Sequence, residues 1–282
     1  MPEEQGVLYI CATPIGNLED VTIRLLKTLR QADLIACEDT RHTLKLLNRY
    51  KIKRPLTSYH QHSKLEKVDY IIGQLQEGKK VALVSDAGMP GISDPGSVLV
   101  ARAIACGIKL EVIPGPSAVI SALALSGMDT TSFTFVGFLP SRRSERQKSI
   151  RAIAQEPRTI VLYEAPHRLL DTLNDLAEIL GEERPIAVMR EMTKLHESVA
   201  RDTVGRLIQH YQQDKPRGEI TLVIAPYLPP SPSEVSLEQV MQEVDELIQQ
   251  GLEKKEAFKL KAREYKIAKS TIYKRYFDKI RQ

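Results

Sequence analysis

Residues 84–96 have the sequence VSDAGMPGISDPG, in which glycine, proline, serine and aspartate follow one another closely. The stretch begins at the end of an apolar run, Lys80–Ser85, that predicts a buried strand, and it leads into a helix starting near Ser97. Loops at the carboxyl ends of strands bind ligands in open α/β sheets, and small residues let the backbone approach a ligand closely. A plain connection with two tight turns is the alternative, but thirteen residues of such restricted composition favour a ligand-binding loop.

The segments around this loop alternate between strand-like and helix-like patterns. Short apolar runs predict four strands, and an amphipathic stripe that includes Leu25 and Leu29 predicts a helix between the first two. Buried apolar runs between amphipathic helices are typical of a mostly parallel sheet in an α/β domain. The predicted strands are Val7–Ala12, Asp33–Glu38, Lys80–Ser85 and Leu110–Ile113.

The pattern changes after a helix-like segment at Ser117–Leu125. Four further strands and an amphipathic helix at Arg168–Leu180 predict a second α/β domain, and the unequal strand lengths indicate a mixed sheet. We therefore expect an N-terminal α/β domain at residues 1–115 and a second α/β domain at residues 116–227. The strands predicted in the second domain are Ser132–Phe138, Thr159–Tyr163, Ile186–Arg190 and Ile220–Ala225.

A proline- and serine-rich segment, residues 228–236, predicts an extended linker to a basic helical tail, residues 237–282. Residues 251–282 hold eleven Lys or Arg and four Asp or Glu, a net charge of +7, whereas the other 250 residues carry −3. One helix at about Leu252–Glu264 and another with its N-cap at Ser270 predict a helix-turn-helix-like pair. The usual turn glycine is missing, so contact with RNA phosphates is favoured over sequence-specific DNA reading, and a solvated helical face is the alternative.

Composition and spacing exclude several classes of protein. With 42% hydrophobic and 27% charged residues, the chain of 282 residues is neither disordered nor fibrous. No apolar run approaches the ~20 residues of a membrane span and the N-terminus lacks a secretory signal, so we expect a soluble cytosolic protein.

Cys11, Cys37 and Cys106 lie far apart, which predicts neither a disulfide framework nor a cysteine zinc site. The loops TPIGN (13–17) and PGPSA (114–118) match neither GxGxxG nor a Walker A motif, which favours a small polar ligand that is not a nucleotide phosphate.

Several motifs in one order closely resemble the bacterial small-subunit ribosomal RNA 2′-O-methyltransferases, which modify a cytidine in the decoding centre of 16S rRNA. That family belongs to the tetrapyrrole-methylase-like, or class III, S-adenosylmethionine (SAM) methyltransferases. The resemblance spans about residues 6–227 and implies a two-domain tetrapyrrole-methylase-like fold, SAM as the cofactor in the cleft between the domains, and a homodimer. The motifs are EDTRHT (38–43), SDAGMPGISDPG (85–96), PGPSA (114–118), GFLP (137–140), YEAPHR (163–168) and REMTKLHE (190–197).

The resemblance also implies which residues bind SAM. They lie in the loops that follow the predicted strands of the first domain and in the YEAPHR and REMTKLHE regions of the second. The first loop, ATPIGN, lacks the GxGPG pattern of tetrapyrrole methylases, which favours RNA over a porphyrinoid substrate. The implied SAM-binding residues are Pro14, Ser85, Asp86, Ala87, Gly88, Pro90, Ile92, Ser93, Ser117, Ala118, Tyr163, Glu164, Ala165, Met192, Glu219 and Thr221.

Methylation of a ribose hydroxyl requires the hydroxyl oxygen to lie in line with the methyl group, together with a base or a cation that stabilises the developing alkoxide. Within the motifs we expect Lys194 to act with Glu197 and Asp39. A lysine beside a carboxylate can lower the hydroxyl pKa electrostatically or, if it is desolvated, act as the base itself. The alternative for Asp39 is that it only caps the next helix.

Basic side chains near the motifs and in the tail predict an RNA-binding surface. His60 and His62 have the i, i+2 spacing of some metal ligands, but no Cys or acid completes a site, so no metal is predicted. Contact with the RNA backbone is favoured, and plain hydrogen bonding within the protein is the alternative. The residues assigned to substrate RNA are Arg41, His42, His60, His62, Arg142, Arg143, Arg146, Arg168, Lys274 and Arg275.

Together these features predict a SAM-dependent 2′-O-methyltransferase that acts on a cytidine of 16S rRNA, with the 30S subunit as the expected partner and no contact with a membrane. Two alternatives stay open at this point. A tetrapyrrole or precorrin methyltransferase would share the fold but would need no basic tail. A nucleic-acid-binding regulator that senses SAM would bind duplex DNA without transferring a methyl group.

Overall fold

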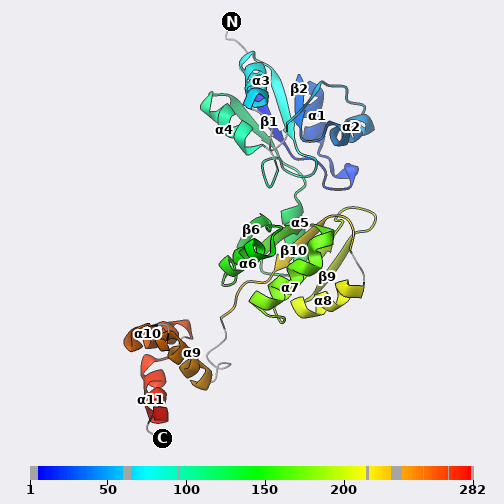
Figure 1. Ribbon diagram of the computed structural model, residues 1–282. Helices are drawn as coiled ribbons and strands as arrows, with labels where there is room; N and C mark the ends of the chain where they lie inside the picture. The colour runs from blue at the N-terminus through cyan, green and yellow to red at the C-terminus, as the bar shows by residue number, and fades with distance from the viewer. Residues whose placement is uncertain are drawn as a thin grey trace. The chain divides into compact units, whose positions relative to one another are not determined.

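The computed structural model describes residues 6–59, 65–94, 96–213, 216–229, 237–249, 251–265 and 267–280. The chain forms two compact units, Met1–Pro226 and Tyr227–Gln282, which are described separately below. The first unit contains two five-stranded sheets and the second unit contains helices (Figure 1). The finer division at residues 1–115, 116–227, 228–236 and 237–282 stays a prediction.

The first sheet is parallel throughout and has the strand order β3-β2-β4-β1-β5. Cys11 at the end of β1 pairs with Val84 of β4 and with Ile113 of β5, so the loops after these three strands begin side by side at the carboxyl edge. The predicted α/β fold with a mostly parallel sheet is confirmed, although β3 was not predicted. The strands are β1 (Val7–Cys11), β2 (Leu34–Cys37), β3 (Leu56–Ser58), β4 (Lys80–Val84) and β5 (Lys109–Ile113).

Helices cover both faces of this sheet (Figure 1). Successive strand residues point to opposite faces, so Leu83 packs with α3 and α4 whereas Val84 packs with α1 and α2. The Thr22 and Asp39 side chains accept backbone N–H groups at the starts of α1 and α2 and thus fix where these helices begin. The helices are α1 (Ile23–Gln31), α2 (Thr40–Arg49), α3 (Leu65–Gln76) and α4 (Ser97–Ala105).

The second sheet is mixed and has the order β6-β7-β10-β8-β9. Only β6 and β7 are parallel, and the other neighbours are antiparallel, as the unequal strands had indicated. The edge strand β9 was not predicted. The strands are β6 (Phe133–Phe138), β7 (Thr159–Glu164), β8 (Pro185–Arg190), β9 (Ser198–Thr203) and β10 (Ile220–Ile224).

Two hydrophobic clusters cover the faces of the second sheet. Leu222 belongs to the cluster formed with α6, α7 and α8, and Val223 belongs to the cluster formed with α5. Ile15 and Met192 join the α5 cluster, so this core reaches the loop after β1 and ties the two sheets together. The helices are α5 (Ala118–Ser126), α6 (Arg143–Ala152), α7 (Leu169–Leu180) and α8 (Val204–Gln213), and short 3-10 turns lie at Leu18–Asp20 and Pro166–Arg168.

The second unit has a hydrophobic core of its own, in which Val244, Phe258 and Ile272 come from three different helices. The Tyr265 hydroxyl donates to Glu243 at 2.6 Å and thereby links the end of α10 to α9. The helices are α9 (Leu237–Gln249), α10 (Lys254–Glu264) and α11 (Lys269–Ile280). The predicted helix pair is therefore present, but the N-cap prediction is wrong because α11 begins at Lys269 and Ser270 lies in its first turn.

Within the described residues, no helix is long and apolar enough to cross a membrane. Cys11, Cys37 and Cys106 are free thiols, and the first two are buried in the core between the first sheet and the helices α1 and α2.

Candidate active site

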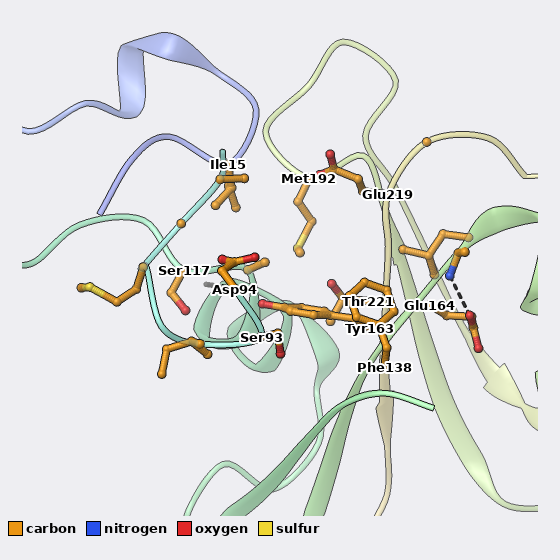
Figure 2. A pocket seen from close by; sticks show the side chains of 18 of the residues that line it. Ile15, Ser93, Asp94, Ser117, Phe138, Tyr163, Glu164, Met192, Glu219 and Thr221 are labelled. Atoms are coloured by element: carbon orange, nitrogen blue, oxygen red, sulfur yellow. Dashed lines mark hydrogen bonds between the residues drawn. The ribbon is translucent and has the colours of Figure 1, made fainter. Parts of the chain in front are cut away.

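A cavity of about 400 Å³ lies between the carboxyl edge of the first sheet and the strand ends of the second (Figure 2). The loops after β1 and β4 and the start of α5 line it from the first side. Phe138 at the end of β6, Tyr163 of β7, Thr221 of β10 and Met192 after β8 line it from the second. The volume falls in the range of about 300–1,000 Å³ that suits a cofactor-sized ligand.

Backbone pairing fixes the wall on the side of the first sheet. Thr13 and Gly88 exchange two backbone hydrogen bonds, at 2.9 and 3.1 Å, so the loops after β1 and β4 form a short antiparallel bridge. The Thr13 hydroxyl donates to the Ser85 carbonyl at 3.1 Å and tightens the same bridge. Gly88 has a φ of +78°, a conformation that glycine adopts without strain. The glycine-rich loop is therefore held in place by main-chain contacts before any ligand binds.

The wall on the side of the second sheet is aromatic. The Tyr163 ring lies 5.0 Å from Phe135, edge to face, and 5.4 Å from Phe138. A register shift in β6 between Phe135 and Gly137, where φ is +75°, precedes Phe138, which is 57% exposed and lines the cavity. The Tyr163 and Phe138 rings offer an apolar surface on which a flat ligand group can stack.

Carboxylates are the charged groups of this cavity. Asp94 and Glu219 line it from opposite sides, and among the described lining residues there is no Lys, Arg or His (Figure 2). Glu164 is turned away, because its carboxylate accepts the Ala165 N–H at 2.7 Å and the Thr172 hydroxyl at 2.5 Å. Burial, together with the charges of Glu38 and Asp86, raises the pKa of Asp94 to about 6. The cavity therefore favours a ligand with a net positive charge.

A smaller cavity of about 230 Å³ lies on the other side of the Thr13–Gly88 bridge. Gly16, Ser85 and Asp86 line this second cavity, whereas Ile15, Ala87 and Gly88 line the first. Neighbouring residues of the same two loops thus face different spaces, and the bridge forms a wall between them.

The sequence is similar to one protein family model and to individual relatives. The family model of the Tetrapyrrole (Corrin/Porphyrin) Methylases matches residues 7–208. The ribosomal RNA small subunit methyltransferase I of Synechocystis sp. is 46% identical over 268 residues, which cover 95% of this chain and 96% of the relative. The protein of the same name from Thermotoga maritima is 51% identical over 220 residues, which cover 78% of this chain and 98% of the relative. The chain belongs to the ribosomal RNA small subunit methyltransferase I family.

The fold agrees with this family. The crystal structure of uroporphyrin-III-C-methyltransferase from Thermus thermophilus superposes with a TM-score of 0.57 at 22% identity, covering 78% of this chain and 94% of that one. The tetrapyrrole-methylase-like fold that the motifs implied is therefore confirmed. Methyltransferases of this fold depend on SAM, as the motifs had also implied.

The first cavity of this ribosomal RNA small subunit methyltransferase I family member fits SAM. SAM carries a positive sulfonium, a positive ammonium and a negative carboxylate, and the cavity offers two carboxylates and an aromatic wall. Most of the residues implied to bind SAM line this cavity: Ala87, Gly88, Ile92, Ser93, Ser117, Ala118, Tyr163, Glu164, Ala165, Met192, Glu219 and Thr221. The others do not, because Pro14, Ser85 and Asp86 line the second cavity and the buried Pro90 lines neither.

Several lining residues were missed at the sequence level. Asp94 lies inside the glycine-rich motif and Phe138 inside GFLP, so the motifs contained these two residues although neither was assigned to SAM. Gly218 directly precedes the implied Glu219. Ile15 and Pro166 carry no polar group that would have singled them out.

Lys194 does not pair with Glu197, in contrast to the expected arrangement. Its Nζ contacts Glu191 Oε1 at 2.8 Å and Glu219 Oε2 at 3.3 Å, whereas the Glu197 carboxylate accepts the Thr193 N–H. Burial lowers the pKa of Lys194, but its hydrogen bond to Glu191 and the charge of Glu219 outweigh burial and raise it. Lys194 therefore stays protonated, which favours the electrostatic role over that of a base.

Asp39 caps the start of α2, which was the alternative to a catalytic role. Its side chain accepts the Arg41 N–H at 2.8 Å at the start of α2 and also pairs with the Arg41 guanidinium. The hydrogen bonds from Arg41 lower the pKa of Asp39 to about 2, so this carboxylate is a weak base.

Arg146 and Arg168, two of the arginines assigned to RNA, are committed to protein contacts, which corrects their assignment. Arg146 is 4% exposed and its Nε contacts Asp175 Oδ2 at 2.7 Å. Arg143 contacts the same carboxylate at 3.0 Å. Arg168 donates to the Leu139 carbonyl at 2.7 Å. A phosphate would have to displace buried acceptors at Arg146 and Arg168, whereas the Arg143 side chain is 69% exposed and its assignment to RNA stays a prediction.

The other residues assigned to RNA are accessible or lie outside the description. Arg41 and Arg142 have side chains that are 87% and 81% exposed, and His42 and Lys274 are exposed on α2 and α11. His60, His62 and the side chain of Arg275 lie outside the described residues. Within the described part of the chain, no group of three or more His, Cys, Asp or Glu side chains could hold a metal ion.

Proposed function

We propose that the protein transfers the methyl group of SAM to the ribose 2′-hydroxyl of a cytidine in 16S rRNA, cytidine 1402 in the family's numbering. The observation that carries the proposal is the 46% identity, over 95% of the chain, to a ribosomal RNA small subunit methyltransferase I. The carboxylate-lined first cavity supports it, because SAM has a net positive charge.

In this reaction SAM supplies an electrophilic methyl group on its sulfonium. The residues that would hold this donor lie between the Thr13–Gly88 bridge and the Tyr163 wall. Bound SAM would give this methyl carbon to the ribose oxygen as its bond to sulfur breaks, and the hydroxyl proton would pass to water. We assign Lys194 the role of stabilising negative charge on the ribose oxygen, because its ammonium stays protonated beside Glu219.

We further propose that the substrate is rRNA within the 30S subunit and that the enzyme is a cytoplasmic homodimer. RNA that is recognised through its shape requires the folded particle. Large apolar side chains on α4, β5 and α5 support a protein interface, since Ile104, Val112 and Ile120 are 62%, 54% and 55% exposed. Sedimentation of the purified protein tests the dimer, and a monomer at micromolar concentration would contradict it.

The reaction is tested by methyl transfer from labelled SAM to 30S subunits that lack the modification, with naked 16S rRNA and a precorrin mixture in parallel. We expect label on a decoding-centre ribose of the 30S subunit. Label on precorrin alone would show that the fold is right and the substrate wrong. Binding of duplex DNA with sequence preference and without methyl transfer would favour a SAM-sensing regulator.

Replacing Lys194 with methionine is expected to lower kcat by about 10²-fold while the Kd of SAM stays within about threefold, because the variant keeps the volume but loses the charge. Single-turnover methyl transfer and calorimetry separate the two effects. Lys27→Met on the exposed side of α1 is the matched control and should behave like the unaltered protein. Full activity of Lys194→Met would remove Lys194 from the mechanism.

SAM binding is expected to weaken as the pH falls through 6, because the Asp94 carboxyl, whose pKa is about 6, then loses its charge. If bound SAM lowers that pKa by about one unit, Kd rises about fivefold between pH 7.5 and pH 5. Folding stability of the free protein should depend on pH in the opposite direction to SAM binding. Because the pKa of Asp94 is raised on folding, the folded state binds this proton more tightly than the unfolded state. The contribution of Asp94 to the free energy of unfolding therefore increases as the pH falls. Calorimetric titrations of Asp94→Asn should show a pH-independent Kd, whereas Asp69→Asn, at an exposed position, should keep the dependence.

A further inference from the structure

The second cavity has the composition of a binding site and is not explained by SAM. Asp86 and Ser85 reach it from the loop after β4, Gly16 from the loop after β1, and His42 and Lys45 from α2. At about 230 Å³ it is smaller than the first cavity of about 400 Å³, so it suits a single planar group better than a cofactor.

The second cavity adjoins the first, in which SAM is proposed to bind. The Thr13–Gly88 bridge is its common wall with the first cavity. Lys194 touches lining residues of both cavities, because its Nζ pairs with Glu219 in the first and its Cγ lies 2.6 Å from where a β-carbon on Gly16 would stand in the second. A nucleotide held in the second cavity would thus have its sugar near the Lys194 ammonium and the donor methyl group.

Asp86 is a positioned hydrogen-bond acceptor in this cavity. Its Oδ1 accepts the backbone N–H of Asp39 at 3.1 Å, which fixes the carboxylate and leaves its other oxygen for a further donor. Of the two RNA pyrimidines, cytosine presents an exocyclic amino group that can donate to a carboxylate, whereas uracil presents a carbonyl oxygen at the same place. A carboxylate here therefore favours cytosine over uracil.

The other lining groups fit the rest of a nucleotide. Leu18 and Leu46 give the cavity apolar surface against which a base can pack. His42 and Lys45 are exposed on α2 and can contact a phosphate. A single-stranded or extruded nucleotide can present base, sugar and phosphate to such a site at once.

We propose that the second cavity receives the base of the acceptor nucleotide and that Asp86 accepts its N4 amino group, so that this cavity makes the enzyme specific for cytosine. The proposal rests on the proposed function. It adds a residue that determines specificity and a site for the substrate base.

The first test blocks the cavity at its edge. His42→Trp is expected to lower kcat/KM for unmodified 30S subunits by at least about 10-fold while the Kd of SAM stays unchanged. Asn48→Trp, at an exposed position of the same helix that does not line the cavity, is the matched control. Equal activity of both tryptophan variants would overturn the proposal.

The second test changes specificity and not only activity. An asparagine at position 86 can still accept the Asp39 N–H through its carbonyl oxygen and then offers an amino group to the base. Asp86→Asn should therefore lower the ratio of kcat/KM for 30S subunits with the target cytidine to that for subunits with uridine at the same position by about 10-fold or more. An unchanged ratio in a variant that still binds SAM would overturn the proposal. If the unaltered enzyme methylates neither particle, the proposed function fails instead, so the two failures are distinguishable.

Discussion

Replacing Gly16 with alanine is expected to lower kcat/KM for methyl transfer by about 10²-fold. A β-carbon at this position would stand 2.6 Å from Lys194 Cγ, 2.7 Å from Thr193 Oγ1 and 2.8 Å from the Met192 carbonyl oxygen, all closer than van der Waals contact. The opposing loop has little freedom to retreat, because Thr193 has a φ of +65° and its hydroxyl accepts the Asn17 N–H at 2.9 Å. The two loops must therefore separate, and a displacement of about 1 Å at a reacting centre can cost 10²-fold in rate.

Gly73→Ala is the matched control for this substitution. Gly73 lies inside α3, and a β-carbon there would meet nothing within 4 Å. Alanine should leave methyl transfer unchanged and stabilise the protein by about 0.5–1 kcal/mol through its higher helix propensity. Methyl transfer by Gly16→Ala at the rate of the unaltered enzyme would show that the contact between the two loops does not position the reacting groups.

Replacing Asp175 with alanine is expected to lower the free energy of unfolding by about 3–5 kcal/mol, because it leaves the buried Arg146 guanidinium without its partner. The Arg146 and Asp175 side chains are 5% and 1% exposed and lie 2.7 Å apart. Asp175 also accepts Arg143 at 3.0 Å and Gln147 at 3.0 Å, so a single carboxylate joins α6 to α7. Urea unfolding followed by far-ultraviolet circular dichroism measures the loss.

Two further variants test whether the loss of stability comes from the unpaired buried charge of Arg146 or from the loss of other contacts. Glu178→Ala removes a carboxylate that also contacts Arg143 but is 51% exposed, and its effect should stay below about 1 kcal/mol. The double variant Arg146→Met with Asp175→Ala leaves no buried charge and should recover most of the stability lost in Asp175→Ala. A loss below 1 kcal/mol in Asp175→Ala would show that water reaches Arg146.

Most strands could be predicted from apolar runs, and the two that were missed have a common physical reason. β3 has three residues, and β9 alternates only weakly between exposed and half-buried positions. Both lie at the edge of a sheet, where one neighbour supplies the hydrogen bonds and little apolar surface is buried. Their pairing partners, β2 and β8, and not their own composition, determine that they are strands.

The loops of the site could be predicted from motifs, but the direction in which each residue faces could not. Asp86 and Ala87 are adjacent in sequence and line different cavities, because the Thr13–Gly88 bridge orients the loop. The ion pair between Arg146 and Asp175 could not be predicted from the motifs either. The two residues lie 29 positions apart, and neither residue type indicates its partner. Such contacts depend on how α6 and α7 pack.

The two carboxylates of the first cavity also have a consequence for turnover. Methyl transfer removes the positive charge from the sulfur, so the product, S-adenosylhomocysteine, is neutral overall whereas SAM is cationic. With SAM bound in this cavity as proposed, Asp94 and Glu219 would attract S-adenosylhomocysteine less strongly than SAM. Methyl transfer would thus weaken the binding of its own product, S-adenosylhomocysteine. This would favour replacement of the product by a new SAM molecule without requiring any movement of the protein.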